Sequence, residues 1–201
     1  MIDCVRECRY DCPGLGSGHK WLLGPRGTGF VWVASEQLSS FWPDPNPDYS
    51  PWLMPEEPRP PIEARTRVER GTHNQAMVIA LGHAVAMMSQ LGMDRVEARV
   101  SHLSSILREE AANLSGVTVL TPMEPGRSAG ITTLTFSGYT PERLRTLVAK
   151  LYDDYKNVVK FQWLTAPSRR DRIGMRISVA PFNPEEEIDH LLAALREELT
   201  R

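Results

Sequence analysis

A lysine in a glycine-rich stretch near the start of the chain gives the clearest sign of chemistry in the sequence. Lys20 lies in the run Gly16–Gly29 and is followed by Trp21 and two leucines. The glycines allow the backbone to approach a ligand closely, and a lysine held out of water by apolar neighbours is more easily deprotonated. A neutral lysine amine can form a Schiff base with a carbonyl group. The stretch therefore predicts covalent chemistry at Lys20, against the ordinary alternative of a solvated surface lysine.

Two polar residues beside this lysine, and one arginine far from it in the sequence, could bind anionic groups. Ser17 and His19 lie on either side of Gly18, where their side chains could donate hydrogen bonds to a phosphate near the amine. Arg176 lies in an expected strand, and a guanidinium can hold a carboxylate through two parallel hydrogen bonds. On its own, Arg176 is more simply interpreted as a strand arginine paired with a surface carboxylate.

The elements that must position these residues follow from the spacing of the apolar residues. In the first half we expect a glycine-rich turn, a short strand at 29–33 and a proline-rich loop at 43–61 that is either functional or a linker. Residues 74–91 have a helical pattern that is apolar on almost every side, which predicts a core helix covered on all faces. From Asp94 the apolar residues form one stripe, typical of a helix that covers a core on one side.

The second half alternates strands and helices. We expect strands at 117–120, 131–136, 158–163 and 173–179. Thr140 is the expected N-cap of one helix and Asn183 that of the last helix, and each is followed by a proline at the first helical position. This half is therefore predicted to be an α/β sandwich of about four strands with helices on one face.

The composition is that of an ordinary globular protein. The 201 residues include 23 Lys or Arg and 25 Asp or Glu, so no positive excess favours nucleic acid or an anionic membrane surface. No segment resembles a signal peptide and no run reaches the ~18 apolar residues of a membrane span, which predicts a cytoplasmic location. The three cysteines, Cys4, Cys8 and Cys12, are expected to be free thiols, and no metal site is predicted.

Three motifs occur in order along the chain. They are the lysine segment Ser17–Gly29 preceded by Asp11, the Gly-Thr-x-Asn segment within Val68–Asn74, and Gly174–Ser178 followed by Phe182–Ile188. With them the sequence resembles the class V aminotransferase family of pyridoxal-phosphate enzymes, which have the α/β architecture called fold type I. That family includes cysteine desulfurases, isopenicillin-N-epimerase-like proteins, C–S lyases and serine–glyoxylate aminotransferases. The resemblance covers nearly the whole chain and implies the C-terminal portion of that fold.

The resemblance implies a role for each matching residue. Lys20 would be the Schiff-base lysine for pyridoxal 5'-phosphate and then the base that moves the Cα proton of an amino-acid substrate. Ser17 and His19 would bind the cofactor phosphate, with Thr72 contributing across a dimer interface. Arg176 would bind the substrate α-carboxylate in a bidentate pair.

The resemblance also implies a division of the chain and a partner. Residues 1–93 would form part of the large cofactor-binding domain, with the lysine motif and the proline-rich loop, and residues 94–201 would form the small α/β domain. The family's N-terminal half carries the group stacked on the pyridine ring and the aspartate at its nitrogen, and it has no counterpart in this sequence. The chain is then expected to be a fragment, a non-catalytic remnant or one subunit of a split enzyme. We expect a homo- or hetero-oligomer with a chain that carries the missing half, and exposed apolar surface on the 74–91 helix without it.

The type of reaction stays open at this point. Desulfurases of the family commonly use a cysteine upstream of the arginine as sulfur acceptor, and no cysteine follows Cys12, which favours C–S lyase, epimerase or aminotransferase chemistry. The alternative function is that of a non-catalytic remnant that acts as an interaction or structural subunit. The spacing names no partners for His73, His83 and His102, which are interpreted as structural or exposed.

Overall fold

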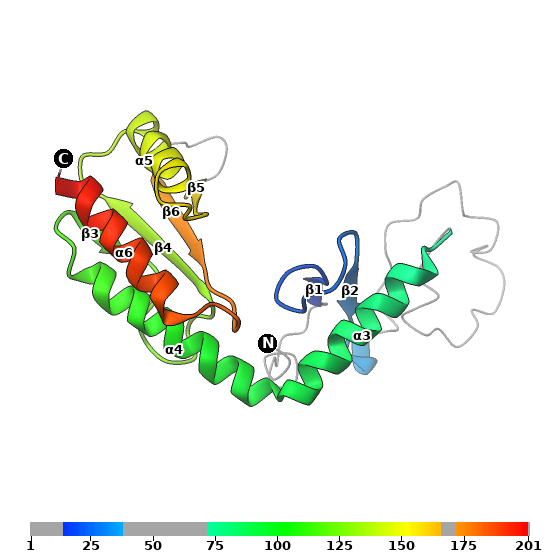
Figure 1. Cartoon of the computed structure of the whole chain (residues 1–201). Helices are drawn as coiled ribbons and strands as arrows, with labels where there is room; N and C mark the ends of the chain where they lie inside the picture. The colour runs from blue at the N-terminus through cyan, green and yellow to red at the C-terminus, as the bar shows by residue number, and fades with distance from the viewer. Residues whose placement is uncertain (1–13, 38–71, 166–171, 201) are drawn as a thin grey trace, which may run out of the picture. The chain divides into compact units, whose positions relative to one another are not determined.

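The structure of the chain is a computed structural model that describes residues 14–37, 72–165 and 172–200 (Figure 1). It divides into two compact units, Met1–Met93 and Asp94–Arg201. The predictions made for Cys4, Cys8 and Cys12, for Asp11 and for the proline-rich loop lie outside the described residues.

The N-terminal unit begins with an antiparallel hairpin of β1 (Gly14–Ser17) and β2 (Gly29–Trp32), followed by the short 3-10 helix η1 (Ser35–Gln37). The strand expected at 29–33 is confirmed, whereas β1 was not predicted. Three of its four residues are Gly or Ser, which have low strand propensity. Gly16 lies opposite Phe30, and a Cβ at Gly16 would lie 2.1 Å from the Phe30 ring. Only glycine lets this aromatic ring cross the partner strand.

Helix α3 (Gln75–Leu91) completes the described part of this unit. It begins after Asn74, whose side chain accepts a hydrogen bond from the Met77 amide, and it ends before Gly92 at φ 85°. The predicted helix is therefore confirmed. The prediction that it is covered on all faces is wrong for this chain, because Met88 is its one buried residue and Ile79 is 60% exposed. The expected exposure of apolar surface on this helix is confirmed instead.

The C-terminal unit contains a four-stranded antiparallel sheet in the order β3-β4-β6-β5. Its strands are β3 (Val117–Val119), β4 (Ile131–Phe136), β5 (Lys160–Trp163) and β6 (Ile173–Ser178). All four strands expected from the sequence are present, with ends shifted by no more than two residues. Sequential order does not give spatial order here, because β6 inserts between β4 and β5.

Three helices cover one face of this sheet: α4 (Met93–Ala112), α5 (Pro141–Asp153) and α6 (Glu185–Thr200) (Figure 1). Their apolar stripes meet the alternate inward residues of β4 and β6 in one core, which includes Leu107, Leu134, Leu147, Met175 and Leu195. Thr140 caps α5 as predicted, accepting a hydrogen bond from the Arg143 amide. The predicted arrangement of helices on one face is confirmed.

The start of the last helix differs from the expectation. Helix α6 begins at Glu185, and the Asn183 side chain does not bond to a main-chain amide of this helix. Its Oδ1 accepts from the Ala180 amide at 2.7 Å and its Nδ2 donates to the Glu187 carboxylate at 2.7 Å. The predicted cap at Asn183 is therefore wrong, because this side chain closes the turn between β6 and α6.

No single helix in the described ranges is long and apolar enough to cross a membrane, although the consecutive helices α3 and α4 would pass the same test of length and composition as a bent pair.

Candidate functional site

The loop that carries Lys20 is held closed by its own backbone. Gly18 donates its amide to the carbonyl of Thr28 at 2.9 Å and accepts from the amide of Gly24 at 2.8 Å. Within this loop, the Leu23 amide donates to the Lys20 carbonyl at 3.0 Å, which makes Lys20 the first residue of a tight turn. Leu23 has φ 57°, so the turn places a non-glycine residue in the left-handed region. These bonds fix the backbone on both sides of the lysine.

Two glycines of this loop pack directly against α3. A Cβ at Gly18 would lie 2.7 Å from Cδ1 of Leu81, and a Cβ at Gly24 would lie 2.8 Å from the same atom. A Cβ at Gly18 would also lie 2.5 Å from Thr28 Oγ1, which itself donates to the Pro25 carbonyl. The glycines predicted to permit a close ligand approach therefore also permit a close approach between the loop and the helix.

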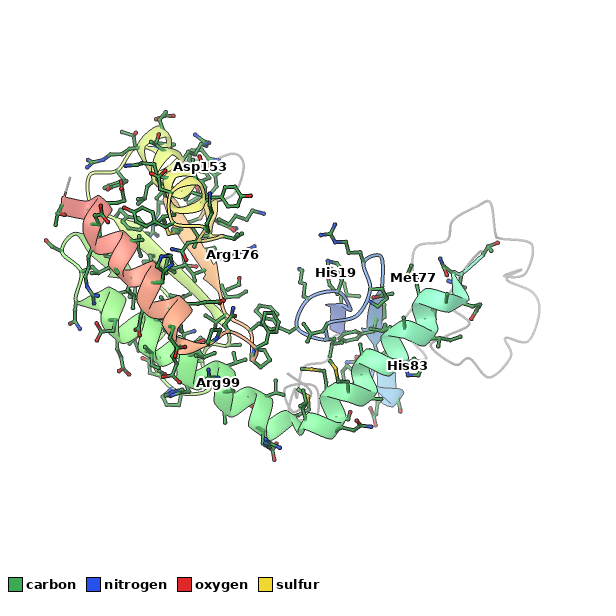
Figure 2. The ribbon with its side chains drawn as sticks, in the orientation of Figure 1. His19, Met77, His83, Arg99, Asp153 and Arg176 are labelled. Carbon is green, nitrogen blue, oxygen red and sulfur yellow. The ribbon has the colours of Figure 1, made fainter. Side chains whose placement is uncertain are left out.

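The hairpin, the lysine loop and the first turns of α3 line a hollow within the N-terminal unit. Ser17, Lys20, His73 and Asn74 are among the polar residues that line it. The apolar residues lining it are Leu15, Trp21, Leu22, Phe30, Val31, Met77, Val78 and Leu81. Figure 2 shows Met77 on α3 and His19 on the loop that joins β1 to β2. The structure therefore brings the first motif and the described end of the second motif, His73 and Asn74, to one place.

The candidate residues of this unit do not all take part in the hollow. Ser17 and Lys20 line it, whereas His19 and Thr72 are exposed and are not among its lining residues. The sequence predicted no site role for His73 and Asn74, two residues of the second motif that follow Thr72 in the chain and line the hollow. Asn74 could have been found from its position before an apolar helical run, because asparagine is a preferred N-cap. Lys20 is exposed in this chain, so the apolar cover expected around it is not provided by the described residues.

Arg176 lies on β6, on the face of the sheet that the helices leave uncovered. Its neighbours across the strands are Thr133 of β4 and Lys160 of β5. The Nε atom of Arg176 is buried and has no hydrogen-bond partner, and no ion pair joins Arg176 to a carboxylate of the described residues. The alternative interpretation, in which Arg176 pairs with a surface carboxylate, is therefore not observed among the described residues.

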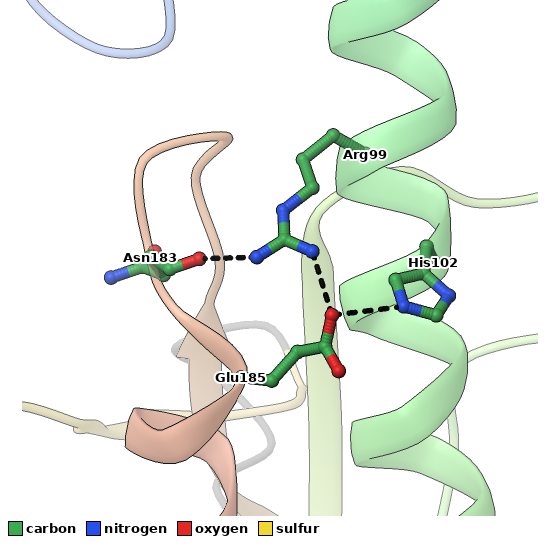
Figure 3. Close-up of polar contacts among 4 residues, drawn as sticks. All are labelled: Arg99, His102, Asn183 and Glu185. Carbon is green, nitrogen blue, oxygen red and sulfur yellow. Dashed lines mark hydrogen bonds and ion pairs between the residues drawn. The ribbon is translucent and has the colours of Figure 1, made fainter.

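A cluster of charged groups ties the start of α6 to α4 (Figure 3). Arg99 donates to Glu185 Oε1 at 2.8 Å and to the Asn183 carbonyl at 3.0 Å, while His102 Nε2 lies 3.1 Å from Glu185 Oε1. The hydrogen bond from Arg99, with that from His102, holds the pKa of Glu185 below its usual range. His102 thus has a partner that the spacing did not predict, because 83 residues separate it from Glu185. The cluster fixes the turn that follows β6.

Comparison with known structures identifies the fold. The apo structure of a cysteine desulfurase from Thermococcus onnurineus NA1 aligns over 98% of this chain and 48% of its own, with a TM-score of 0.72 and 22% identity. A complex of the cystine C–S lyase C-DES with cysteine persulfide aligns over 90% of this chain and 45% of its own, with a TM-score of 0.67. The chain therefore has part of the α/β fold of fold type I enzymes, as expected.

Sequence comparison identifies the family. The family model for class V aminotransferases matches residues 9–191, and the chain belongs to this family. Isopenicillin N epimerase of Amycolatopsis lactamdurans is 29% identical over 192 residues, which are 90% of this chain and 46% of that protein. A cysteine desulfurase of Salmonella agona is 25% identical over 189 residues, or 43% of its length. The chain spans about half the length of the curated relatives it matches.

The cofactor expected from the sequence is the one bound by relatives of this fold. One structure of C-DES has glycine covalently linked to its pyridoxal-phosphate cofactor. The residues described above fit the lysine and phosphate side of such a site, because an amine and a hydroxyl line one hollow beside a helix N-terminus.

Proposed function

We propose that this chain carries the cofactor lysine and the substrate arginine of a pyridoxal-phosphate-dependent enzyme that acts on an amino acid at Cα or Cβ. The observation that supports the proposal is that Lys20 and Ser17 line one hollow with the first turn of α3. The loop hydrogen bonds of Gly18 and Gly24 hold the lysine backbone in place without help from its side chain. The amine of Lys20 is therefore available for a ligand.

Each proposed residue has a task that its chemistry can perform. When bound, the cofactor supplies a carbonyl carbon for the lysine amine and an electron sink for the substrate. Lys20 holds the cofactor and then moves the proton at the substrate Cα. The Ser17 hydroxyl donates to the phosphate, whose charge is also stabilised by the positive end of α3. Arg176 holds the substrate α-carboxylate with two hydrogen bonds.

His19 and Thr72 complete the phosphate site in this proposal. Both are exposed, which agrees with contacts made outside the hollow. We propose that His19 donates to the phosphate from the lysine loop, and that Thr72 does so in a neighbouring subunit. Only the contact from Thr72 requires an assembled protein, because His19 lies in the same loop as Lys20.

The reaction we propose is that of a C–S lyase, an epimerase or an aminotransferase, in the cytoplasm. These reactions need the lysine and the cofactor, whereas a desulfurase also needs a cysteine that accepts sulfur. No cysteine follows Cys12 in the sequence. The relatives include an epimerase at 29% identity, which agrees with chemistry that does not use such a cysteine.

A second chain completes the protein in this proposal. Apolar residues of α3 are widely exposed, Val78 by 55% and Ile79 by 60%, and burying such residues is favourable by about 25 cal/mol per Å². The same exposure, and that of Lys20, also favours the alternative of a non-catalytic interaction subunit. The two functions differ in whether the lysine binds the cofactor.

The experiment is visible absorption spectroscopy of the purified protein, with and without any chain that copurifies, after addition of pyridoxal phosphate. We expect imine absorbance in the wild type and in Lys156→Ala, and its loss in Lys20→Ala with an unchanged circular dichroism spectrum. Imine absorbance that persists in Lys20→Ala contradicts the assignment of the lysine. A wild-type protein without absorbance in any assembly supports the interaction subunit.

A further inference from the structure

The uncovered face of the C-terminal sheet contains two positive charges opposite each other. Lys160 on the edge strand β5 is the cross-strand partner of Arg176 on β6. Directly opposite residues of an antiparallel pair have Cβ atoms about 4.5–5.5 Å apart, so like charges there repel each other. Solvent screens part of this repulsion because Lys160 is exposed, and an anion that contacts both groups would relieve it further.

No carboxylate of the described residues provides this neutralisation. The ion pairs of the described C-terminal unit involve Arg99, His102, Arg145, Lys150 and Arg196, and none involves Lys160 or Arg176. The described side chain across from Arg176 on the other side is Thr133, which is uncharged. Two cations therefore share one face without an acidic partner from the described part of the chain.

The buried Nε atom of Arg176, a residue that is itself partly exposed, gives a second, independent indication of a ligand. Its Nε donor is buried and unpartnered, which is costly for a charged group in a folded protein. A carboxylate that accepts from Nε and one Nη of an arginine makes the usual bidentate pair. Lys160 is exposed beside it and can turn its ammonium toward the same ligand.

Charge balance selects the class of ligand. One carboxylate neutralises Arg176 and leaves the charge of Lys160 uncompensated, whereas two carboxylates in one molecule neutralise both. We propose that Lys160 is a specificity-determining residue, which binds the second carboxylate of an amino-dicarboxylic acid while Arg176 binds the first. The binding of a dicarboxylate is inferred from the sheet itself. Only the statement that this ligand is a substrate rests on the proposed function.

The test uses the full chain and needs no cofactor. We measure the binding of glutarate and of propionate at constant ionic strength, following the amide NMR signals of β5 and β6. The wild type is expected to bind glutarate at least tenfold more tightly than propionate. In Lys160→Met this preference should be lost, because a hydrogen bond to a charged group contributes about tenfold or more to affinity, and Lys160→Arg should restore much of it.

Arg172→Met is the matched control, because Arg172 is an exposed cation next to β6 and its loss changes the net charge by the same amount. An equal loss of glutarate binding in Arg172→Met and Lys160→Met would overturn the proposal in favour of unspecific attraction. Unchanged glutarate binding in Lys160→Met would also overturn the proposal. Lys160 would then be a lysine whose only role is to discourage the pairing of edge strand β5 with another strand. A wild type that prefers propionate, or binds neither acid, also overturns it.

The result is separable from the test of the cofactor lysine. Lys20 lies in the N-terminal unit and Lys160 in the C-terminal unit. A failure of glutarate binding leaves the imine on Lys20 untouched, and a missing imine leaves the two-cation site intact.

Discussion

The guanidinium of Arg108 on α4 donates from Nε to Thr132 Oγ1 of β4 at 3.1 Å, inside the C-terminal unit. Its Nη atoms donate to Ser128 Oγ at 2.7 Å and to the carbonyls of Ala129 and Ile131 at 2.6 and 3.1 Å. Arg108 is only 5% exposed, and its burial lowers its pKa from the ordinary value. One buried cation thus joins helix α4 to the segment that leads into β4.

We expect Arg108→Met to destabilise the chain by about 3 kcal/mol or more, because it leaves buried acceptors without donors. The measurement is urea unfolding followed by circular dichroism. Arg196→Met is the control, because Arg196 makes a 2.8 Å ion pair with Glu110 in which both side chains are about half exposed. Such a pair contributes about 0–1 kcal/mol. Equal losses in the two variants would show that the Arg108 contacts are not stabilising.

The comparison of Arg108 with its neighbours shows what the sequence could predict about this unit. The stripe through Val100, Leu103 and Leu107 predicted the buried side of α4 from spacing alone, and all three residues are buried. Arg108 could not be predicted in the same way, because arginine is usually exposed and its acceptors come from a segment 20 to 24 residues later. The spacing of apolar residues predicts which side of a helix is buried. It does not predict which groups from distant parts of the sequence contact that side.

The candidate site shows the same limit. The glycines around Lys20 predicted a tight loop, and the structure contains one. The lining of the hollow depends on α3, which follows the loop after a long stretch of chain, so His73 and Asn74 were missed. The all-round apolar pattern of α3 predicted that the helix needs cover. The exposure of this helix in the described part of the chain was predicted by the resemblance to the family and not by the pattern itself.

The close contact between the lysine loop and α3 gives a second prediction. We expect Gly18→Ala to destabilise the N-terminal unit by about 1–3 kcal/mol, because the added Cβ would overlap Thr28 and Leu81. Hydrogen exchange of the β1 and β2 amides measures this locally. Gly82→Ala on α3 is the control, since a Cβ there has nothing within 4 Å and should stabilise the helix by about 0.5–1 kcal/mol. Unchanged exchange in Gly18→Ala would contradict the packing argument.

The charged cluster on α4 and α6 gives a prediction at acid pH. The hydrogen bond from Arg99 lowers the pKa of Glu185 from 4.5, so the folded chain releases this proton more readily than the unfolded chain. Its contribution to stability is present above about pH 4.5 and is lost as the pH falls through the lower folded-state pKa. As the pH falls from about 4.5 through that pKa, the free energy of unfolding of Glu185→Gln should therefore decrease less than that of the wild type.

Thermal unfolding at a series of pH values measures this difference. Glu142→Gln is the control, because Glu142 is exposed and its contact with Arg145 on the same helix is longer, at 3.7 Å. It should follow the wild-type curve more closely than Glu185→Gln does. Parallel curves for the wild type and Glu185→Gln would show that the cluster does not contribute to acid sensitivity.

The opposite end of α6 gives a prediction at alkaline pH. Tyr155 donates to Glu198 Oε1 at 3.1 Å, and Lys150 Nζ donates to Glu198 Oε2 at 2.6 Å. Burial of Tyr155, together with hydrogen bonds to Glu197 and Glu198, raises its pKa from 10.0 to about 12. The folded chain therefore keeps a proton that the unfolded chain has already lost. The stabilisation from this group is complete below about pH 10 and declines as the pH rises toward 12.

Tyr155→Phe removes the titrating group and leaves the ring in place, so the free energy of unfolding of this variant should fall less steeply than that of the wild type between these pH values. Urea unfolding at each pH measures the difference, in which the titration of other groups cancels. Tyr152→Phe is the control, because Tyr152 lies in the last turn of α5, three residues before Tyr155, and is 57% exposed. If the wild type and Tyr155→Phe keep a constant difference across the interval, the proton on Tyr155 is not held by Glu198. In that case the ion pair of Lys150 with Glu198 and the shared apolar core would account for the attachment of α5 to α6.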